Sequence, residues 1–275
     1  MYKILKKETL NDAVTSFTVS APLVAAKVKA GQFVIIRIDE EGERIPLTVS
    51  DFDRDNGTIT LVVQTVGYTT KKLALLNEGD FISDVVGPLG LPTEFGTPKK
   101  AVVIGGGVGC AIAFPQAKTM HNMGVEVDII AGFRNKDIVI LEDKMRAVCN
   151  NLHITTDDGS YGEKGLVTDV LKRLLSADNY DLVIAIGPIP MMKFVSLVTK
   201  EFGVKTIVSL NPIMIDGTGM CGGCRVNVGG EIKFACVDGP DFDGHLVDFD
   251  GLMRRNSYYR EEESHICRMG EQHNA

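Results

Sequence analysis

Three of the six cysteines gather in one glycine-rich segment of the chain. Cys221, Cys224 and Cys236 follow Asp216 with the spacing Asp-x4-Cys-x2-Cys, and eleven residues separate the last two cysteines. Plant-type [2Fe–2S] proteins use this spacing with cysteine in the first position. The glycines between these residues allow backbone conformations that let a loop wrap a small inorganic core. The segment therefore predicts a [2Fe–2S] cluster with Asp216 as one of its four ligands.

Other interpretations of the same segment remain open. A zinc site also uses Cys-x2-Cys, but the segment holds no histidine, so zinc would need Asp216 or a remote ligand. A disulfide is disfavoured because we expect a cytoplasmic chain. Cys267 is the alternative fourth ligand, 31 residues after Cys236 in a charged tail. A carboxylate is a harder donor than a thiolate and would change the reduction potential, yet we favour Asp216.

A second candidate site is a glycine-rich turn. The apolar run Ala101–Ile104 predicts a strand, and a helical pattern follows from Ala111 to Asn122. A strand, a glycine turn and a helix N-terminus together can bind phosphate. The turn does not match G-x-G-x-x-G, and a tight turn without a ligand is the alternative, although that explains one or two glycines more easily than four in five. The turn consists of Gly105, Gly106, Gly107, Val108 and Gly109.

Two further positions end strands of the same region. Asp157 and Asp158 follow the third predicted strand, and ligands bind at the carboxyl ends of strands in open parallel sheets. These carboxylates could bind the ribose hydroxyls of NAD(H) or could equally form a solvated turn. Gly187 and Pro188 close the fourth strand, where the backbone could approach a nicotinamide.

The N-terminal part offers weaker candidates for flavin contacts. Two short stretches carry them, and each could also be an edge strand or a turn. The candidates are Arg44, Ile45, Pro46, Leu47 and Thr48 in the first stretch, and Val62, Val63, Gln64, Gly67, Thr69 and Thr70 in the second.

The elements that must position these residues fall into four parts. Residues 1–97 show short strands such as Phe33–Ile38 and Thr58–Val66, with one helix near Lys71–Leu76, which predicts a small β-barrel or sandwich. Residues 98–210 alternate apolar strands and helices, which indicates a parallel α/β sheet covered on both faces. Residues 211–250 form the cluster segment, and 251–275 form a charged tail.

Bulk composition excludes some classes of function. The net charge of −7 argues against a nucleic-acid partner, because the phosphate backbone requires cationic neutralisation. No apolar run is long enough for a transmembrane helix, and the N-terminus has no apolar core of signal-peptide type. We therefore expect a cytoplasmic protein of two or more domains that does not bind membranes.

Taken together, the chain resembles the ferredoxin–NADP reductase superfamily with a C-terminal [2Fe–2S] extension. The stretches Arg44–Thr48, Gly105–Gly109, Thr156–Ser160 and Met214–Cys224 carry the resemblance, with Phe234–Pro240. The resemblance implies an FAD-binding β-barrel, a ferredoxin-reductase-type α/β domain for NAD(H), and a cluster loop. Two members are similar. One is the small subunit of NADH-dependent reduced ferredoxin:NADP oxidoreductase. The other is the electron-transfer subunit of dihydroorotate dehydrogenase.

Asp216 favours the first of these two members, because the dihydroorotate dehydrogenase subunit has cysteine at that position. The resemblance then implies hydride exchange between NADH and FAD, with single electrons relayed by the cluster. It implies a larger partner with FAD and [4Fe–4S] clusters that binds NADP(H) and ferredoxin, in flavin-based electron bifurcation. No side chain is expected to act as general acid or base. The rival of another class is a non-catalytic zinc protein with a degenerate nucleotide fold.

The sequence departs from the superfamily pattern at two places. The flavin motif has an arginine three residues before its hydroxyl residue, but Ile45 occupies that position here and Arg44 lies one residue earlier. The Cys-Gly-Pro near the nicotinamide is Ile186-Gly187-Pro188 in this chain, without the thiol.

Overall fold

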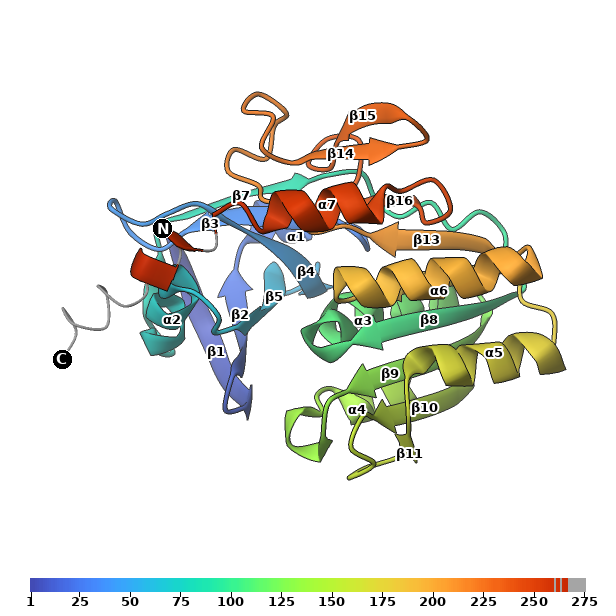
Figure 1. Cartoon of the computed structure of the whole chain (residues 1–275). Coiled ribbons are helices and arrows are strands. Elements are labelled where there is room, and N and C mark those ends of the chain that lie inside the picture. Colours follow the sequence, from blue (N-terminus) through green and yellow to red (C-terminus); the bar gives the residue numbers. More distant parts are fainter. Residues whose placement is uncertain (260, 263, 267–275) are drawn as a thin grey trace.

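The computed structural model describes residues 1–259, 261–262 and 264–266. Figure 1 shows a β-rich N-terminal part beside an α/β part, with the segment that carries β14, β15 and α7 lying across them. The predicted combination of a β-barrel, an α/β domain and a C-terminal cluster segment is confirmed. The residue boundaries between these parts stay a prediction.

The N-terminal part is a nearly closed antiparallel barrel. Its strands follow the order β6-β1-β2-β5-β4-β3-β7, and every neighbouring pair is antiparallel. Alternating side chains such as Ile59, Leu61 and Val63 fill its core. The elements are β1 Tyr2–Asn11, β2 Val14–Ser20, α1 Pro22–Ala25, β3 Phe33–Arg37, β4 Ile45–Asp53, β5 Thr58–Gln64, α2 Tyr68–Leu75, β6 Phe81–Ile82 and β7 Asp84–Leu89.

The second sheet has the order β11-β10-β9-β8-β12-β13-β16. Its first six strands are parallel, as predicted. The nearly continuous apolar runs of the central strands β8, β9, β12 and β13 are buried on both faces of the sheet. The elements are β8 Lys100–Gly106, η1 Gly107–Gly109, α3 Cys110–Asn122, β9 Glu126–Phe133, η2 Lys136–Ile138, α4 Glu142–Arg146, β10 Asn151–Thr156, β11 Glu163–Lys164, α5 Val167–Ala177, β12 Leu182–Ile186, α6 Ile189–Phe202 and β13 Lys205–Ser209.

Two hydrophobic cores lie on opposite faces of this sheet. Helices α5 and α6 cover one face, where Leu171 and Met192 pack against Val183. Helices α3 and α4 cover the other face, where Ala117 and Met145 belong to a second buried cluster. The parallel strands therefore end at a common edge that both layers of helices leave accessible.

The cluster segment contains regular structure that the sequence pattern did not predict. It forms β14 Arg225–Val228, β15 Glu231–Phe234, β16 Asp241–Asp243 and the beginning of α7 Phe249–Asn256. Strand β16 pairs antiparallel with β13, so the expected parallel sheet has an antiparallel edge. The side chains of Cys224, Cys236 and Leu252 are buried in the same core as α5 and α6. The segment is therefore part of the α/β core.

Candidate functional site

A cavity of about 1630 Å³ separates the barrel from the α/β sheet. Strands β4 and β5 supply one wall, and the carboxyl ends of β8, β12 and β13 supply another. Most of the predicted cofactor contacts line this one space. They are Pro46, Leu47, Thr48, Val62, Val63, Gln64, Thr70, Gly106, Gly107, Val108, Gly109, Asp157, Gly187 and Pro188.

The other predicted contacts do not line the cavity. Arg44 is exposed just before β4, and the Thr69 hydroxyl donates to Glu43 Oε2 at 2.6 Å. Asp158 Oδ1 accepts hydrogen bonds from the Ser160 N–H and hydroxyl, which lower the pKa of Asp158. The remaining three are Ile45, Gly67 and Gly105. Cofactor contact stays a prediction for every one of these residues. The position of the cavity supports it for the residues that line the cavity.

The glycine turn has a local reason for its composition. Gly107 has φ +56°, and a side chain added there would meet no atom within 4 Å, so its backbone faces open space. At Gly109 an added Cβ would lie 2.4 Å from the Ile186 carbonyl oxygen. At Gly106 it would lie 2.5 Å from Met191 Sδ. The turn thus brings the N-terminus of α3 against β12, and its residues line the cavity, which is a setting in which phosphate can bind.

Sequence reasoning missed several cationic and apolar residues of the cavity. Arg134 and Lys172 line it, and Arg134 follows directly after β9. The rule that ligands bind at the carboxyl ends of strands could have found Arg134. Lys172 lies on α5, and Phe194 on α6 is 58% exposed although it lines the cavity. The positions of Lys172 and Phe194 in the sequence indicate only that each lies on an amphipathic helix. No signal in the sequence therefore predicts that they line a cofactor cavity.

The cluster loop brings the four predicted ligands together in two pairs. The Cys224 and Cys236 sulfurs lie 3.2 Å apart, buried and free of a disulfide. The Cys221 Sγ lies 3.4 Å from Asp216 Oδ1, and this pair is exposed. Three thiols and a carboxylate are ligand types that iron accepts, and two pairs suit a cluster of two irons. The donor set therefore fits a [2Fe–2S] cluster.

Hydrogen bonds hold the Asp216 carboxylate in place. Oδ2 accepts from the Met220 and Cys221 N–H groups at 3.1 and 3.2 Å, and Oδ1 accepts from the Thr218 N–H at 3.2 Å. Desolvation raises the pKa of Asp216, but hydrogen bonds from Thr218 and Cys221 outweigh it and lower the pKa to about 2. Asp216 is therefore an anion at neutral pH and is oriented within the loop.

The cysteine pair has a different environment. Burial and the Cys224 thiol raise the pKa of Cys236 to about 12. Iron binds the thiolate, so cluster assembly must displace the proton of Cys236. Among the residues that the structure describes, no group of three or more His, Cys, Asp or Glu side chains is arranged to hold a single metal ion. Cys267, the alternative ligand, lies outside the described residues.

The cavity and the cluster loop are neighbours in the structure. Asn211, Pro212, Ile213 and Met214 line the cavity, and the chain reaches Asp216 two residues later. A Cβ added at Gly217 would lie 2.9 Å from Ile35 Cγ1, so the loop packs directly on the barrel. The chain segment that lines the cavity therefore leads directly into the cluster loop. None of the helices in the described ranges has the length and apolar character of a membrane span.

Known proteins share both the sequence and the fold of this chain. Residues 211–248 match the iron–sulfur cluster binding domain of dihydroorotate dehydrogenase B. A Thermotoga maritima homologue of the electron-transfer subunit of that NAD⁺-dependent enzyme is 48% identical over 261 residues, which cover 95% of this chain and 92% of the homologue. The corresponding Fusobacterium nucleatum subunit is 35% identical and covers 80% and 87%. An uncharacterised Clostridium beijerinckii protein is 55% identical and covers 96% and 92%.

Solved structures agree with these relatives. A chain of an NADH-dependent reduced ferredoxin–NADP oxidoreductase, studied for flavin-based electron bifurcation, superposes with a TM-score of 0.92. It is 47% identical, with 96% of this chain and 95% of the other covered. Phthalate dioxygenase reductase has a TM-score of 0.60 at 16% identity, with 82% and 85% covered, which shows the shared fold alone.

Proposed function

Because this chain belongs to the family of dihydroorotate dehydrogenase B electron-transfer subunits and their homologues, we propose that it is the NAD(H)-side subunit of an NADH-dependent reduced ferredoxin–NADP oxidoreductase. It is an oxidoreductase subunit of the ferredoxin–NADP reductase type, with a fold for FAD and NAD(H) and an iron–sulfur domain. The observation that carries the finer assignment is Asp216, oriented at the first ligand position of the cluster loop.

In this proposal, residues of the cavity bind FAD and NAD(H), and residues of the loop bind the cluster. When bound, FAD exchanges a hydride with NAD(H), and the cluster transfers single electrons. Residues of β4 and β5 hold the flavin, and the Gly106–Gly109 backbone binds dinucleotide phosphates. Asp157 accepts hydrogen bonds from ribose hydroxyls, and the Gly187 backbone approaches the nicotinamide. The apolar wall of Ile213 and Met214 excludes water between the cavity and the loop.

The proposal extends to a partner. Electrons leave through the cluster loop to a larger subunit with its own FAD and [4Fe–4S] clusters, which binds NADP(H) and ferredoxin. Bifurcation there couples NADPH oxidation to the reduction of NAD⁺ and ferredoxin, or runs in reverse. A cytoplasmic location is part of this proposal. The 47% sequence identity to a chain of the bifurcating oxidoreductase supports the assignment of this partner.

Purification of the chain with its native partner tests the proposal. We expect FAD, iron and labile sulfide in the chain, NADH-dependent reduction of an artificial acceptor, and a partner that contains FAD and additional iron. A partner with FMN and a dihydroorotate-oxidising activity would instead establish the second candidate, the dihydroorotate dehydrogenase subunit. The names of the relatives favour that candidate. Zinc without iron would overturn both.

Two matched variants test the ligand set. We expect Asp216→Ala to lose most of the iron and the electron paramagnetic resonance signal of the reduced cluster, because one ligand and its hydrogen bonds are removed. Cys267→Ala should keep both. If Cys267→Ala loses the cluster and Asp216→Ala retains it, the assignment of Asp216 as ligand is wrong.

A further inference from the structure

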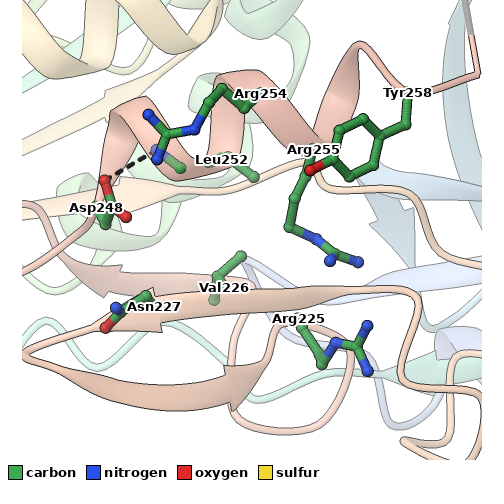
Figure 2. A pocket seen from close by; sticks show the side chains of 9 residues that line it. Arg225, Val226, Asn227, Asp248, Leu252, Arg254, Arg255 and Tyr258 are labelled. Carbon is green, nitrogen blue, oxygen red and sulfur yellow. Dashed lines mark hydrogen bonds between the residues drawn. The ribbon is translucent and has the colours of Figure 1, made fainter.

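A second, smaller pocket lies beside the cluster loop. It measures about 230 Å³ and lies between β14 and α7. Figure 2 shows Arg225 from the strand and Arg255 from the helix extending into the same region, with Tyr258 above them. Arg254 also lines the pocket. We refer to this space, lined by Arg225, Arg254 and Arg255, as the arginine pocket.

The arginine pocket carries positive charge that no ion pair neutralises in the part of the chain that the structure describes. Within the described ranges, none of its three arginines forms an ion pair. Asp248 is the only carboxylate that lines the pocket in the described chain, and its Oδ1 accepts the Gly251 N–H at the start of α7. The concentration of cations is notable because the chain has a net charge of −7.

Two of the arginines also touch the cluster loop. Arg255 Nη2 donates to the Gly223 carbonyl oxygen at 3.2 Å. A Cβ added at Gly222 would lie 3.6 Å from Arg225 Nη1. Gly222 and Gly223 separate the predicted ligands Cys221 and Cys224. The arginine pocket and the cluster loop therefore form one continuous surface.

The loop side of this surface is apolar and exposed. Met220 is 88% exposed, Ile215 is 55% exposed, and Val237 is 38% exposed. Methionine and arginine are enriched at protein interfaces, and the fully buried centre of an interface is more apolar than the rest of the surface. A small anion such as phosphate could neutralise the arginines but would leave these apolar side chains in water. A protein surface would cover both.

We propose that the arginine pocket receives a carboxylate side chain from an acidic patch of the larger partner subunit. A guanidinium binds a carboxylate with two parallel hydrogen bonds, which fixes orientation as well as affinity. The apolar side chains of the loop pack against apolar residues around that carboxylate. This docking sets the partner's electron acceptor opposite the cluster loop. The inference rests on the proposed function, because it requires a partner subunit.

The experiment measures the dissociation constant between the cofactor-loaded chain and its purified native partner. Arg225→Met and Arg254→Met should each raise it about 30-fold or more, as expected for loss of one member of a buried charge pair. Arg225→Lys keeps the charge without the planar fork and should give a smaller increase. Sodium chloride should weaken wild-type binding more steeply than binding of Arg225→Met. Visible absorption of each variant verifies that the cluster is present.

Arg173→Met is the matched control. Arg173 lies on α5, far from β14 in Figure 1, and is paired with Glu163 at 2.8 Å. We expect this variant to bind the partner like the wild type. If Arg225→Met and Arg254→Met bind the partner as tightly as the wild type does, the docking proposal is wrong and the partner assignment is unaffected. Arg225-dependent binding of inorganic phosphate with unchanged partner affinity would also overturn the docking proposal. A wild-type chain that purifies with no partner would overturn both the docking proposal and the partner assignment.

Discussion

The Asp241 carboxyl shows how one buried polar group joins three parts of the fold. Oδ2 of this β16 residue accepts hydrogen bonds from the Thr93 hydroxyl at 2.5 Å and the Gln116 amide at 3.4 Å. Asp241 Oδ1 and Gln116 Oε1 are buried and have no hydrogen-bond partner in the described structure. Burial raises the pKa of Asp241, although its hydrogen bonds oppose the shift. The folded state therefore favours the protonated carboxyl.

This raised pKa has a defined consequence for stability. A carboxyl with a raised folded-state pKa lowers the free energy of unfolding as the pH rises above its unfolded pKa of about 3.9. Asp241→Asn removes the charge, and its amide can donate to Gln116 Oε1. We expect the variant to be about 1–3 kcal/mol more stable than wild type at pH 8. The gain should shrink towards pH 5.

Urea unfolding at both pH values measures these differences. Asp243→Asn is the control, because Asp243 is exposed on the same strand and its bond from the His245 N–H is kept by asparagine. Its effect should stay within about 0.5 kcal/mol. A gain for Asp241→Asn that does not change between pH 5 and pH 8 would contradict the explanation by ionisation.

At the residue scale, the sequence could predict those features that depend on residues close together in the chain. The spacing of the predicted ligands from Asp216 to Cys236 is local, and the structure brings those residues together in two pairs. Thr93, Gln116 and Asp241 are far apart in the sequence, and their polarity alone suggests solvent-exposed positions. Their burial arises from tertiary packing, so no local pattern could predict it.

At the scale of the elements, a hydrogen bond joins β4 to α3. A proline inside α3 leaves the carbonyl group that accepts this hydrogen bond without its usual helical donor. Pro115 lies inside α3 and has no N–H, so it cannot donate to the carbonyl of Ala111 four residues earlier. The buried Ser50 hydroxyl of β4 donates to that carbonyl at 2.7 Å instead. The barrel thus satisfies a backbone group of the α/β domain, which ties the two domains together.

A double-mutant cycle can measure this contact. Ser50→Ala leaves the Ala111 carbonyl buried and unsatisfied, so we expect a loss of about 1–3 kcal/mol in the free energy of unfolding. In a Pro115→Ala background the new N–H can complete the helix, and Ser50→Ala should cost less. Urea unfolding of all four proteins gives the coupling energy. Equal costs of Ser50→Ala in both backgrounds would show that the hydroxyl does not serve the carbonyl.

The sequence predicted most of the elements because their apolar runs have clear periods. The strand predicted at Thr58–Val66 begins at the same residue in the structure and ends at Gln64, and the helix predicted from Ala111 to Asn122 begins at Cys110. The strands of the cluster segment were missed because β14, β15 and β16 have three or four residues each. The helix α1 was missed for the same reason, since it has four residues.

For the whole molecule, the decisive feature is a cavity with walls from both domains. A cofactor bound there contacts the barrel and the α/β sheet at once. Ligands that bind only the folded state stabilise it by about 4 kcal/mol at a thousandfold excess over the dissociation constant. FAD should therefore raise the unfolding temperature of flavin-free protein in a single transition, measured by calorimetry and by intrinsic fluorescence. Stabilisation of one of two separate transitions would contradict a site shared by both domains.

The pairing of β16 with β13 also protects the molecule from self-association. Without residues 211–250, β13 would be the outer strand of the sheet, and its apolar residues Ile207 and Val208 would lie on an unpaired edge. Such an edge can pair with the same edge of another copy. The segment that matches the iron–sulfur cluster binding domain thus also covers the edge strand of the α/β sheet and prevents it from pairing with another sheet. Removing it to obtain a cluster-free reductase would expose a surface prone to aggregation.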